Sequence, residues 1–473
     1  MKRRTFIKTA TASLAALATP KTKETHAQAA GEKPNILFIM IDDLGKEWFS
    51  CYGADGIATP NFDRLAATGM RFENAYSMPQ CTPTRVALLT GTYPFRNGWI
   101  NHWDVPRWGS GCHFDWNKYV SFARVMKSAG YATAVAGKWQ VNDFRVQPDA
   151  LKQHGFDEWC MWTGGEGGNP PSDKRYWDPY IFTGGDSKTY EGSYGPDVFV
   201  DFLEDFMTRK REEPMMMYFP MCLTHVPFVD TPHEPGIEGK MERHKAMVRY
   251  TDYLVGRLTD KLDSLGLREN TIIFLTTDNG TAQGVEGSLK GRTVNGGKAT
   301  LKESGVNAPF IVNCPGKVPE GVVSDALTDF TDMLPTFAEI GGAELPDKLE
   351  LDGKSIAPHI LGEADDSGRD WILGMGFGAA KLTGEGVRPI KTHTDRVIRD
   401  KRFKLWIENR KSTKLYDLIN DPGETKNLIG NNMPIVRNAL RKFESVTAKF
   451  PSRDSWPKYD STPPQEWDTA PKL

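Results

Sequence analysis

The sequence of 473 residues is long enough for one large hydrophobic core and a smaller satellite domain. Its 59 Lys and Arg residues nearly balance its 61 Asp and Glu residues, so neither a general nucleic-acid-binding surface nor a long acidic tail is expected. No apolar run reaches the length of a bilayer-spanning helix.

The N-terminal segment is typical of an export signal and not of a folded domain. Arg3 and Arg4 precede a modestly apolar stretch, and a small-residue cleavage pattern ends at Ala29. We therefore expect residues 1–29 to be a twin-arginine-type signal peptide that directs the protein to the periplasm or out of the cell.

Four apolar segments are predicted to be buried strands that end in polar residues. They cover residues 35–41, 131–136, 215–219 and 271–277. The polar residues that follow them include Asp42, Asp43, Lys138, His225, Asp278 and Asn279. Helical patterns that begin near Thr59, Val120 and Met241 separate these strands. This alternation indicates an α/β fold with a largely parallel sheet, in which the four strand ends meet at one crevice.

The remaining segments are less regular. Residues 164–195 are rich in Gly, Pro, Asp and aromatic residues, and we expect a long surface insertion that lines a substrate site. Segments 397–406 and 414–418 predict a hairpin meander, which a helix over 434–447 follows.

The segment from Cys81 to Arg85 is predicted to begin a helix. Thr82 suits the cap position and Pro83 the first helical position, so Cys81 would lie just outside, beside the positive end of the helix. Arg85 would add a bidentate contact for an oxyanion. Cys81 is thus a candidate nucleophile, although an isolated cysteine there would more often be structural.

The cysteines and the acidic pairs indicate which metal the chain would hold. The six cysteines, at positions 51, 81, 112, 160, 222 and 314, show no zinc-like spacing. Asp42, Asp43, Asp278 and Asn279 are oxygen ligands, which suit Ca²⁺ or Mg²⁺ better than Zn²⁺. If Cys81 is chemically committed, an odd number of cysteines remains, so at least one of them is free.

These residues together resemble the formylglycine-dependent sulfatases of the alkaline-phosphatase-like superfamily, in particular exported bacterial arylsulfatases and carbohydrate sulfatases. Cys81, Pro83 and Arg85 match the Cys-x-Pro-x-Arg core of that family. Further matching motifs lie at residues 35–43, 89–98, 276–280, 297–309, 331–336, 352–355 and 415–428. The resemblance covers nearly the whole mature chain.

The resemblance implies a fold and a division into domains. We expect an α/β fold with a large mixed, mostly parallel sheet that helices flank. A small C-terminal α+β subdomain with a short antiparallel sheet would follow it. The sulfatase catalytic domain is expected to cover residues 30–385, and the subdomain with its extended tail residues 386–473.

The resemblance also implies that a separate maturation enzyme oxidises Cys81 to formylglycine. The hydrated aldehyde would supply the hydroxyl that attacks the sulfur atom of a sulfate ester. A cation, calcium in preference to magnesium, would be held by Asp42, Asp43, Asp278, Asn279 and the modified Cys81.

Four further residues are implied to take part in catalysis. Arg85 and Lys138 would hold the hydrated aldehyde. His225 and Lys298 would contact the sulfate, with His225 as the proton donor to the leaving alcohol.

One position departs from the family pattern. Gln140 stands where the family usually has a histidine that serves as the base when sulfate is released. Because a glutamine side chain accepts no proton at neutral pH, another group has to act, and Asp143 and His102 are candidates. A second departure is Asn307, where the family often has arginine.

The expected substrate is a sulfated small molecule or glycan, with a carbohydrate as the first candidate. We expect the protein to have no nucleic-acid partner and no membrane span. The candidate substrate contacts are His102, Trp103, Arg175, Trp177 and His233. Two alternatives stay open. One is a phosphodiesterase or phosphonate monoester hydrolase of the same superfamily, and the other is a non-catalytic carbohydrate-binding relative, which only Gln140 favours.

Overall fold

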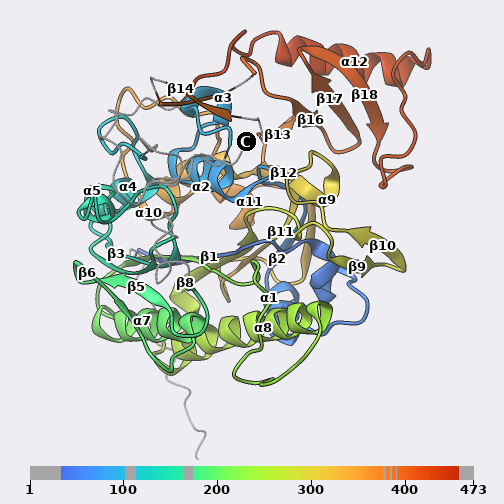
Figure 1. The fold of residues 1–473 in the computed structure, drawn as a ribbon. Helices are drawn as coiled ribbons and strands as arrows, with labels where there is room; N and C mark the ends of the chain where they lie inside the picture. The colour runs from blue at the N-terminus through green and yellow to red at the C-terminus, as the bar shows by residue number, and fades with distance from the viewer. Residues whose placement is uncertain are drawn as a thin grey trace, which may run out of the picture. The chain divides into compact units, whose positions relative to one another are not determined.

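A ten-stranded mixed sheet forms the centre of the molecule (Figure 1). The computed structural model describes residues 33–101, 113–164, 174–376, 380–383, 386–389 and 391–456, so the predicted signal at residues 1–29 lies outside the described residues. The strands of this sheet, in chain order, are β1 (Asn35–Ile41), β2 (Met70–Tyr76), β3 (Ala132–Lys138), β4 (Glu158–Trp162), β5 (Tyr180–Thr183), β6 (Asp186–Thr189), β7 (Met215–Pro220), β8 (Thr271–Thr277), β11 (Asn307–Asn313) and β12 (Val322–Asp329).

The spatial order of the strands is β12-β2-β11-β8-β1-β7-β3-β4-β5-β6. The four strands predicted from apolar runs, β8, β1, β7 and β3, are neighbours and run parallel. Their carboxyl ends therefore meet at one edge of the sheet, as expected. Ile41 of β1 pairs with Thr277 of β8, so the residues that follow these two strands begin side by side.

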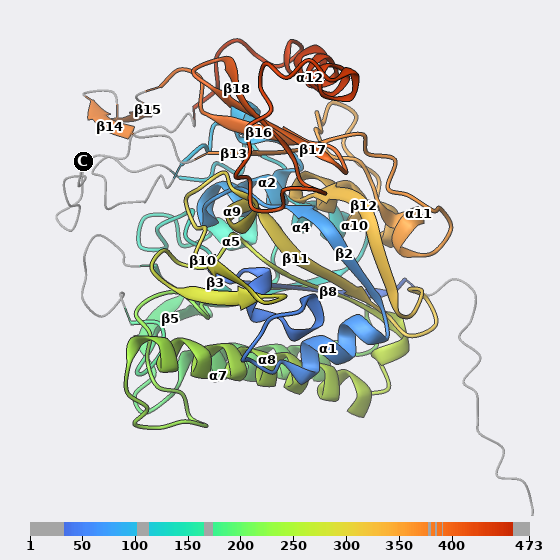
Figure 2. The same cartoon turned by 90° about the vertical axis from the view of Figure 1, so that its right-hand side faces the viewer.

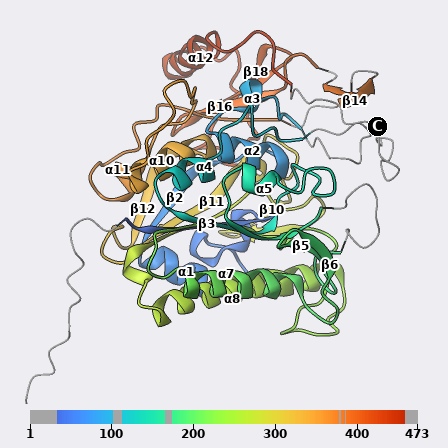
Figure 3. The same ribbon diagram turned by 90° about the vertical axis from the view of Figure 1, so that its left-hand side faces the viewer.

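Helices cover both faces of the sheet, and β1 shows why its sequence is continuously apolar. Ile36 and Phe38 belong to one core, whereas Leu37 and Ile39 belong to the other. The helices on the first face are α2 (Cys81–Thr90), α4 (Phe122–Ser128) and α10 (Met333–Gly341) (Figure 3). Those on the second face are α1 (Pro60–Ala67), α7 (Gly195–Arg209) and α8 (Lys240–Ser264).

A second, antiparallel sheet has the order β13-β16-β17-β18 and packs on α12 (Pro434–Thr447) (Figure 2). Its strands are β13 (Ile372–Met375), β16 (Arg396–Arg399), β17 (Phe403–Glu408) and β18 (Lys411–Asp417). The predicted meander and last helix are confirmed, but a single strand over 397–406 is wrong. The side chain of Asp400 accepts hydrogen bonds from the backbone N–H groups of Arg402 and Phe403, and this turn separates β16 from β17.

The insertion at residues 164–195 is more regular than expected. Within it, β5 and β6 form a hairpin that extends the large sheet beyond β4. Four-residue strands are too short to show a period in the sequence, which is why the hairpin was not predicted. The domain boundary near residue 385 stays a prediction. The small sheet has strands on both sides of this residue, because β13 precedes it and pairs with β16.

The smaller elements connect these layers. They are α3 (Pro94–Asn97), α5 (Ala150–Gln153), α9 (Glu303–Val306), α11 (Ala357–Ile360), and the two hairpins β9 (Glu286–Leu289) with β10 (Arg292–Asn295) and β14 (Ala380–Thr383) with β15 (Gly386–Pro389). Among the helices of the described residues, none is both long and apolar enough to cross a bilayer.

Candidate active site

The site is built at the carboxyl ends of β1 and β8. Asp42 and Asp278 follow these neighbouring strands directly, and the backbone N–H of Asp278 donates to the carbonyl of Ile41 over 2.9 Å. The backbone N–H of Asp43 lies 3.2 Å from Asp278 Oδ1, and Asn279 Nδ2 donates to Asp43 Oδ1 over 2.8 Å. The structure thus brings the four predicted oxygen ligands together, and all four side chains are buried.

Each of the three carboxylates in this group, those of Asp42, Asp43 and Asp278, forms an ion pair with a basic side chain. Lys138 Nζ lies 2.6 Å from Asp42 Oδ2, at the end of β3. Two more pairs complete the set: Arg85 Nη2 with Asp278 Oδ2, and Lys298 Nζ with Asp43 Oδ2, both at 2.7 Å. Charge pairing of this kind is what allows so many ionised groups to be buried in one place.

The two neighbouring aspartates differ in their proton affinity. Burial raises the pKa of Asp42, but Lys138, His225 and Arg85 lower it more, so it stays well below its usual range. Burial and the charge of Asp42 raise the pKa of Asp278 well above its usual range, although Arg85 opposes the shift. An added cation beside both carboxylates would therefore stabilise their ionised forms.

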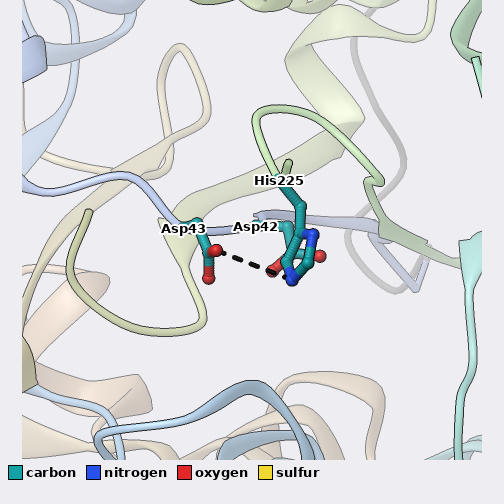
Figure 4. A group of neighbouring side chains, drawn as sticks. All are labelled: Asp42, Asp43 and His225. Carbon is teal, nitrogen blue, oxygen red and sulfur yellow. Dashed lines mark ion pairs between the residues drawn. The ribbon is translucent and has the colours of Figure 1, made fainter. Parts of the chain in front are cut away.

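Two buried oxygen atoms indicate where a cation fits. Asp42 Oδ1 and Asn279 Oδ1 have no hydrogen-bond partner among the described residues. Figure 4 shows Asp42, Asp43 and His225, whose ligand atoms all lie within 4.8 Å of one another. A buried oxygen without a partner is costly unless a cation binds it, so this donor set fits a hard metal ion.

Cys81 lies at the first position of α2 and is buried. The prediction that it precedes the helix is wrong, because Gln80 is the N-cap residue and accepts from the backbone N–H of Thr84 over 3.2 Å. Thr84, which sequence reasoning missed, donates through Oγ1 to the carbonyl of Asp278 over 2.6 Å. This bond ties the first turn of α2 to the end of β8.

Gln140 faces Cys81 directly. Its Oε1 lies 3.8 Å from Cys81 Sγ, and its φ of 62° is in the left-handed region, which a glutamine rarely adopts. Asp143, a candidate base, has its carboxylate engaged by Arg145 at 3.1 Å. The other candidate, His102, lies outside the described residues.

Of the predicted substrate contacts, Arg175 is in contact with a residue of the site. Arg175 Nη1 lies 3.2 Å from His225 Nδ1, so this arginine adjoins the site. Trp177 is 38 % exposed and donates through Nε1 to the carbonyl of Asp230 over 3.1 Å, and His233 packs on Tyr253 with the ring centroids 4.3 Å apart. Trp103, like His102, lies outside the described residues.

Sequence reasoning also missed a buried link between the two acidic loops. Thr281 Oγ1 accepts from the backbone N–H of Gly45 over 2.8 Å and donates to Glu47. Burial raises the pKa of Glu47 to about 7, although the hydrogen bond from Thr281 opposes the shift. Nothing in the sequence around Glu47, four residues after Asp43, indicates that this side chain is buried and bonded to Thr281.

A family model described as "Sulfatase" matches residues 34–343, and one described as "N-sulphoglucosamine sulphohydrolase, C-terminal" matches residues 297–447. The chain belongs to the sulfatase family. It is 29% identical to an N-acetylgalactosamine-6-O-sulfatase of Bacteroides thetaiotaomicron, over 88% of this chain and 94% of that protein. An N-acetylgalactosamine-6-sulfatase of Canis lupus familiaris is 32% identical, over 71% of this chain and 67% of that protein.

Solved structures share the fold of this sulfatase. Ps i-CgsB in complex with k-i-k-neocarrahexaose superposes with a TM-score of 0.74 at 24% identity, over 90% of this chain and 95% of the other. A protein in complex with its substrate D-glucosamine-2-N,6-O-disulfate gives a TM-score of 0.69 at 22% identity, over 89% and 98%. Membership of the family implies a formylglycine and a metal ion, and Asp42, Asp43 and His225 fit a metal site.

Proposed function

We propose that this chain releases inorganic sulfate from a sulfated glycan, with a formylglycine made from Cys81 as the nucleophile. The observation that carries the proposal is the position of Cys81 at the start of α2, beside the acidic strand ends. Cys81 is close enough to Arg85, Lys298 and Asp278 for its charge to affect the pKa of each. A sulfated N-acetylgalactosamine is the first substrate to test, because two relatives are named for that activity.

The cation is proposed to be Ca²⁺, with Mg²⁺ as the second choice. Asp42, Asp43, Asp278, Asn279 and the modified Cys81 would hold it. When bound, it offsets the negative charge of the sulfate and lowers the pKa of a hydroxyl that it contacts. The unpartnered Asp42 Oδ1 and Asn279 Oδ1 support this assignment, because both atoms are oxygen donors that Ca²⁺ prefers.

The chain's own residues supply the other functions. Arg85 and Lys138 would orient the hydrated aldehyde, and Lys298 would contact the sulfate. His225 would donate a proton from Nε2 to the leaving alcohol as an imidazolium, which the negative charge of a bound sulfate ester favours, while its Nδ1 lies 2.7 Å from the carbonyl of Val226. Nε2 itself lies 3.7 Å from Asp43 Oδ2, at the edge of the acidic group.

Maturation and transport complete the proposal. A formylglycine-generating enzyme would act on Cys81, and a twin-arginine-type signal at residues 1–29 would export the protein to the periplasm or beyond. The substrate contact closest to the site would be Arg175, beside His225.

The test combines mass spectrometry with an assay of sulfate release. In active protein, the peptide that contains Cys81 should lose the mass that separates CH₂–SH from CHO. Cys81→Ala should abolish sulfate release from N-acetylgalactosamine 6-sulfate and leave the melting temperature nearly unchanged. Cys51→Ala, a change at a half-buried cysteine, is the matched control and should keep activity.

Two outcomes would contradict the proposal. An unmodified thiol at Cys81 in fully active protein would exclude the nucleophile. Preferential hydrolysis of a phosphodiester or phosphonate monoester by the modified enzyme would exclude the substrate class.

A further inference from the structure

The short helix α9 follows the loop that carries Lys298, and Figure 1 and Figure 2 both show it below the small antiparallel sheet. The helix begins at Glu303, whose backbone N–H donates to Glu424 Oε2 over 2.6 Å. Glu424 belongs to the loop after β18 and lies 121 residues further along the chain. A residue from a distant part of the sequence therefore holds the first turn of α9.

The side chain of Glu424 is itself fixed by the small antiparallel sheet. It is only 4 % exposed, and its Oε1 lies 3.0 Å from Lys404 Nζ and accepts from Trp406 Nε1 over 3.0 Å. Its φ of 55° is in the left-handed region, which a glutamate rarely adopts. A buried carboxylate on a strained backbone indicates that the exact position of this side chain matters to the protein.

The backbone of α9 packs directly on the loop of Lys298. A Cβ atom on Gly297, the residue before Lys298, would lie 2.3 Å from the backbone of Ser304, so a glycine is needed for this close approach. On its other side, α9 meets the turn after β8. There the N–H of Gly280 donates to the carbonyl of Gly305 over 3.1 Å. The position of α9 is thus transmitted to both segments without an intervening side chain.

The Lys298 side chain has little freedom to adjust if its backbone moves. Its Nζ lies 2.7 Å from Asp43 Oδ2, and in the proposed function the same atom contacts the sulfate. The backbone N–H groups of Lys298 and Ala299 donate to the carbonyls of Thr281 and Pro79, over 3.0 and 2.7 Å. These bonds hold the loop on the side of the acidic strand ends, and α9 holds it on the side of the small sheet.

We propose that Glu424 is a positioning residue for Lys298, on which it acts through α9. Its carboxylate fixes the first N–H of α9, the backbone of α9 fixes Gly297, and Lys298 follows directly in the chain. The inference rests on the proposed function only for the contact of Lys298 with the sulfate. It makes the loop after β18 part of the support of the active site.

The kinetic test uses the mature enzyme, nitrocatechol sulfate and excess calcium, well below the melting temperature of each variant. Glu424→Ala should lower kcat/KM about 10- to 100-fold, the scale of a displacement of about 1 Å at a catalytic group. In a Lys298→Ala background the same change should cost less than about two-fold, because the side chain that Glu424 positions is absent. Glu424→Gln keeps an acceptor oxygen for the N–H of Glu303 and should retain most of kcat/KM.

Phe443→Leu is the matched control for a general loss of stability. Phe443 lies in the apolar core between α12 and the small antiparallel sheet. This variant should have a lower melting temperature but an unchanged kcat/KM. An unchanged kcat/KM in Glu424→Ala, or equal losses in the wild-type and Lys298→Ala backgrounds, would overturn the inference.

Hydrogen exchange measured by mass spectrometry separates this inference from the proposed function. The amides of residues 296–306 should lose protection in Glu424→Ala and keep it in Phe443→Leu. Unchanged protection of this segment in Glu424→Ala would overturn the inference. If the wild type hydrolyses no sulfate ester but the segment loses protection in Glu424→Ala, the positioning of the Lys298 loop stands and the proposed function fails.

Discussion

The Asn279→Ala variant tests the cation site at a buried oxygen atom that lacks a hydrogen-bond partner among the described residues. Asn279 Oδ1 is buried and lacks a partner among the described residues, while Nδ2 donates to Asp43 Oδ1 and to the carbonyl of Gly280. The substitution removes the free oxygen together with these two hydrogen bonds. The variant should therefore be less stable than the wild type without calcium. In addition, calcium should raise its melting temperature by less than it raises that of the wild type.

The expected rise in melting temperature follows from the free energy of calcium binding to the folded protein. Calcium at about 100 times its Kd stabilises the wild type by about 2.7 kcal/mol. An unfolding entropy of about 2.1 cal/mol/K per residue gives roughly 1.0 kcal/mol/K for this chain, so the melting temperature should rise by about 3 °C. If the lost ligand weakens binding about 100-fold, the same calcium concentration stabilises the variant by only about 0.4 kcal/mol, or about 0.4 °C.

The assay is thermal unfolding in a chelator and again in excess calcium, with magnesium as a parallel series. Asn313→Ala is the matched control. Asn313 is equally buried, and its Nδ2 donates to the carbonyl of Leu65 away from the acidic strand ends. The control should lose stability but keep the full rise of about 3 °C. A full rise in Asn279→Ala would refute Asn279 as a ligand, and no rise in the wild type with either ion would refute the cation site.

Three further changes test other parts of the structure. Glu303→Gln leaves the almost fully buried Arg399 short of a counter-charge, while Lys404 keeps Glu424 at 3.0 Å, and should cost about 3 kcal/mol in urea unfolding at pH 7. Burial raises the pKa of Glu303, but Lys404 and Arg399 lower it more, to about 2. Its stabilisation is therefore complete above about pH 4.5 and lost as the pH falls through about 2, so the difference between variant and wild type should shrink to about 1 kcal/mol at pH 3. Gln140→His should increase turnover and add an acidic limb to the pH–rate profile, and an unchanged profile would mean that this position does not limit sulfate release. Glu47→Gln should raise the melting temperature at pH 8 more than at pH 5, because the raised pKa of about 7 makes ionised Glu47 destabilising at higher pH, and equal shifts at both pH values would contradict this.

The strands that carry the site could be predicted because both faces of each are buried. Such strands are continuous apolar runs that end abruptly in polar residues, and the predicted bounds of β1 and β8 agree with the structure. The register between them was not visible in the sequence. The pairing of Ile41 with Thr277 is what turns two separate acidic pairs into one group.

Contacts between distant segments could not be predicted from a single sequence. Lys404 and Arg399 of the small antiparallel sheet bind Glu303, which follows the Lys298 loop by a few residues. Asn307 joins the same carboxylate through Nδ2 over 2.9 Å. Arg399 and Lys404 thus neutralise Glu303 from a distant part of the chain, and no local sequence pattern signals these contacts.

The balance of charge at the site explains why its acidic residues can exist without a metal and still bind one. It contains three carboxylates and three cations, in the pairs Asp42 with Lys138, Asp43 with Lys298 and Asp278 with Arg85. Burial lowers the pKa of His225 to about 4, so the histidine adds no charge at neutral pH. With all three carboxylates ionised the protein alone is close to neutral at this point, and the raised pKa of Asp278 means that the site is no more negative than this before the ion arrives. A divalent cation then leaves a positive site, and that excess of positive charge is what a sulfate ester needs as negative charge grows on its oxygens.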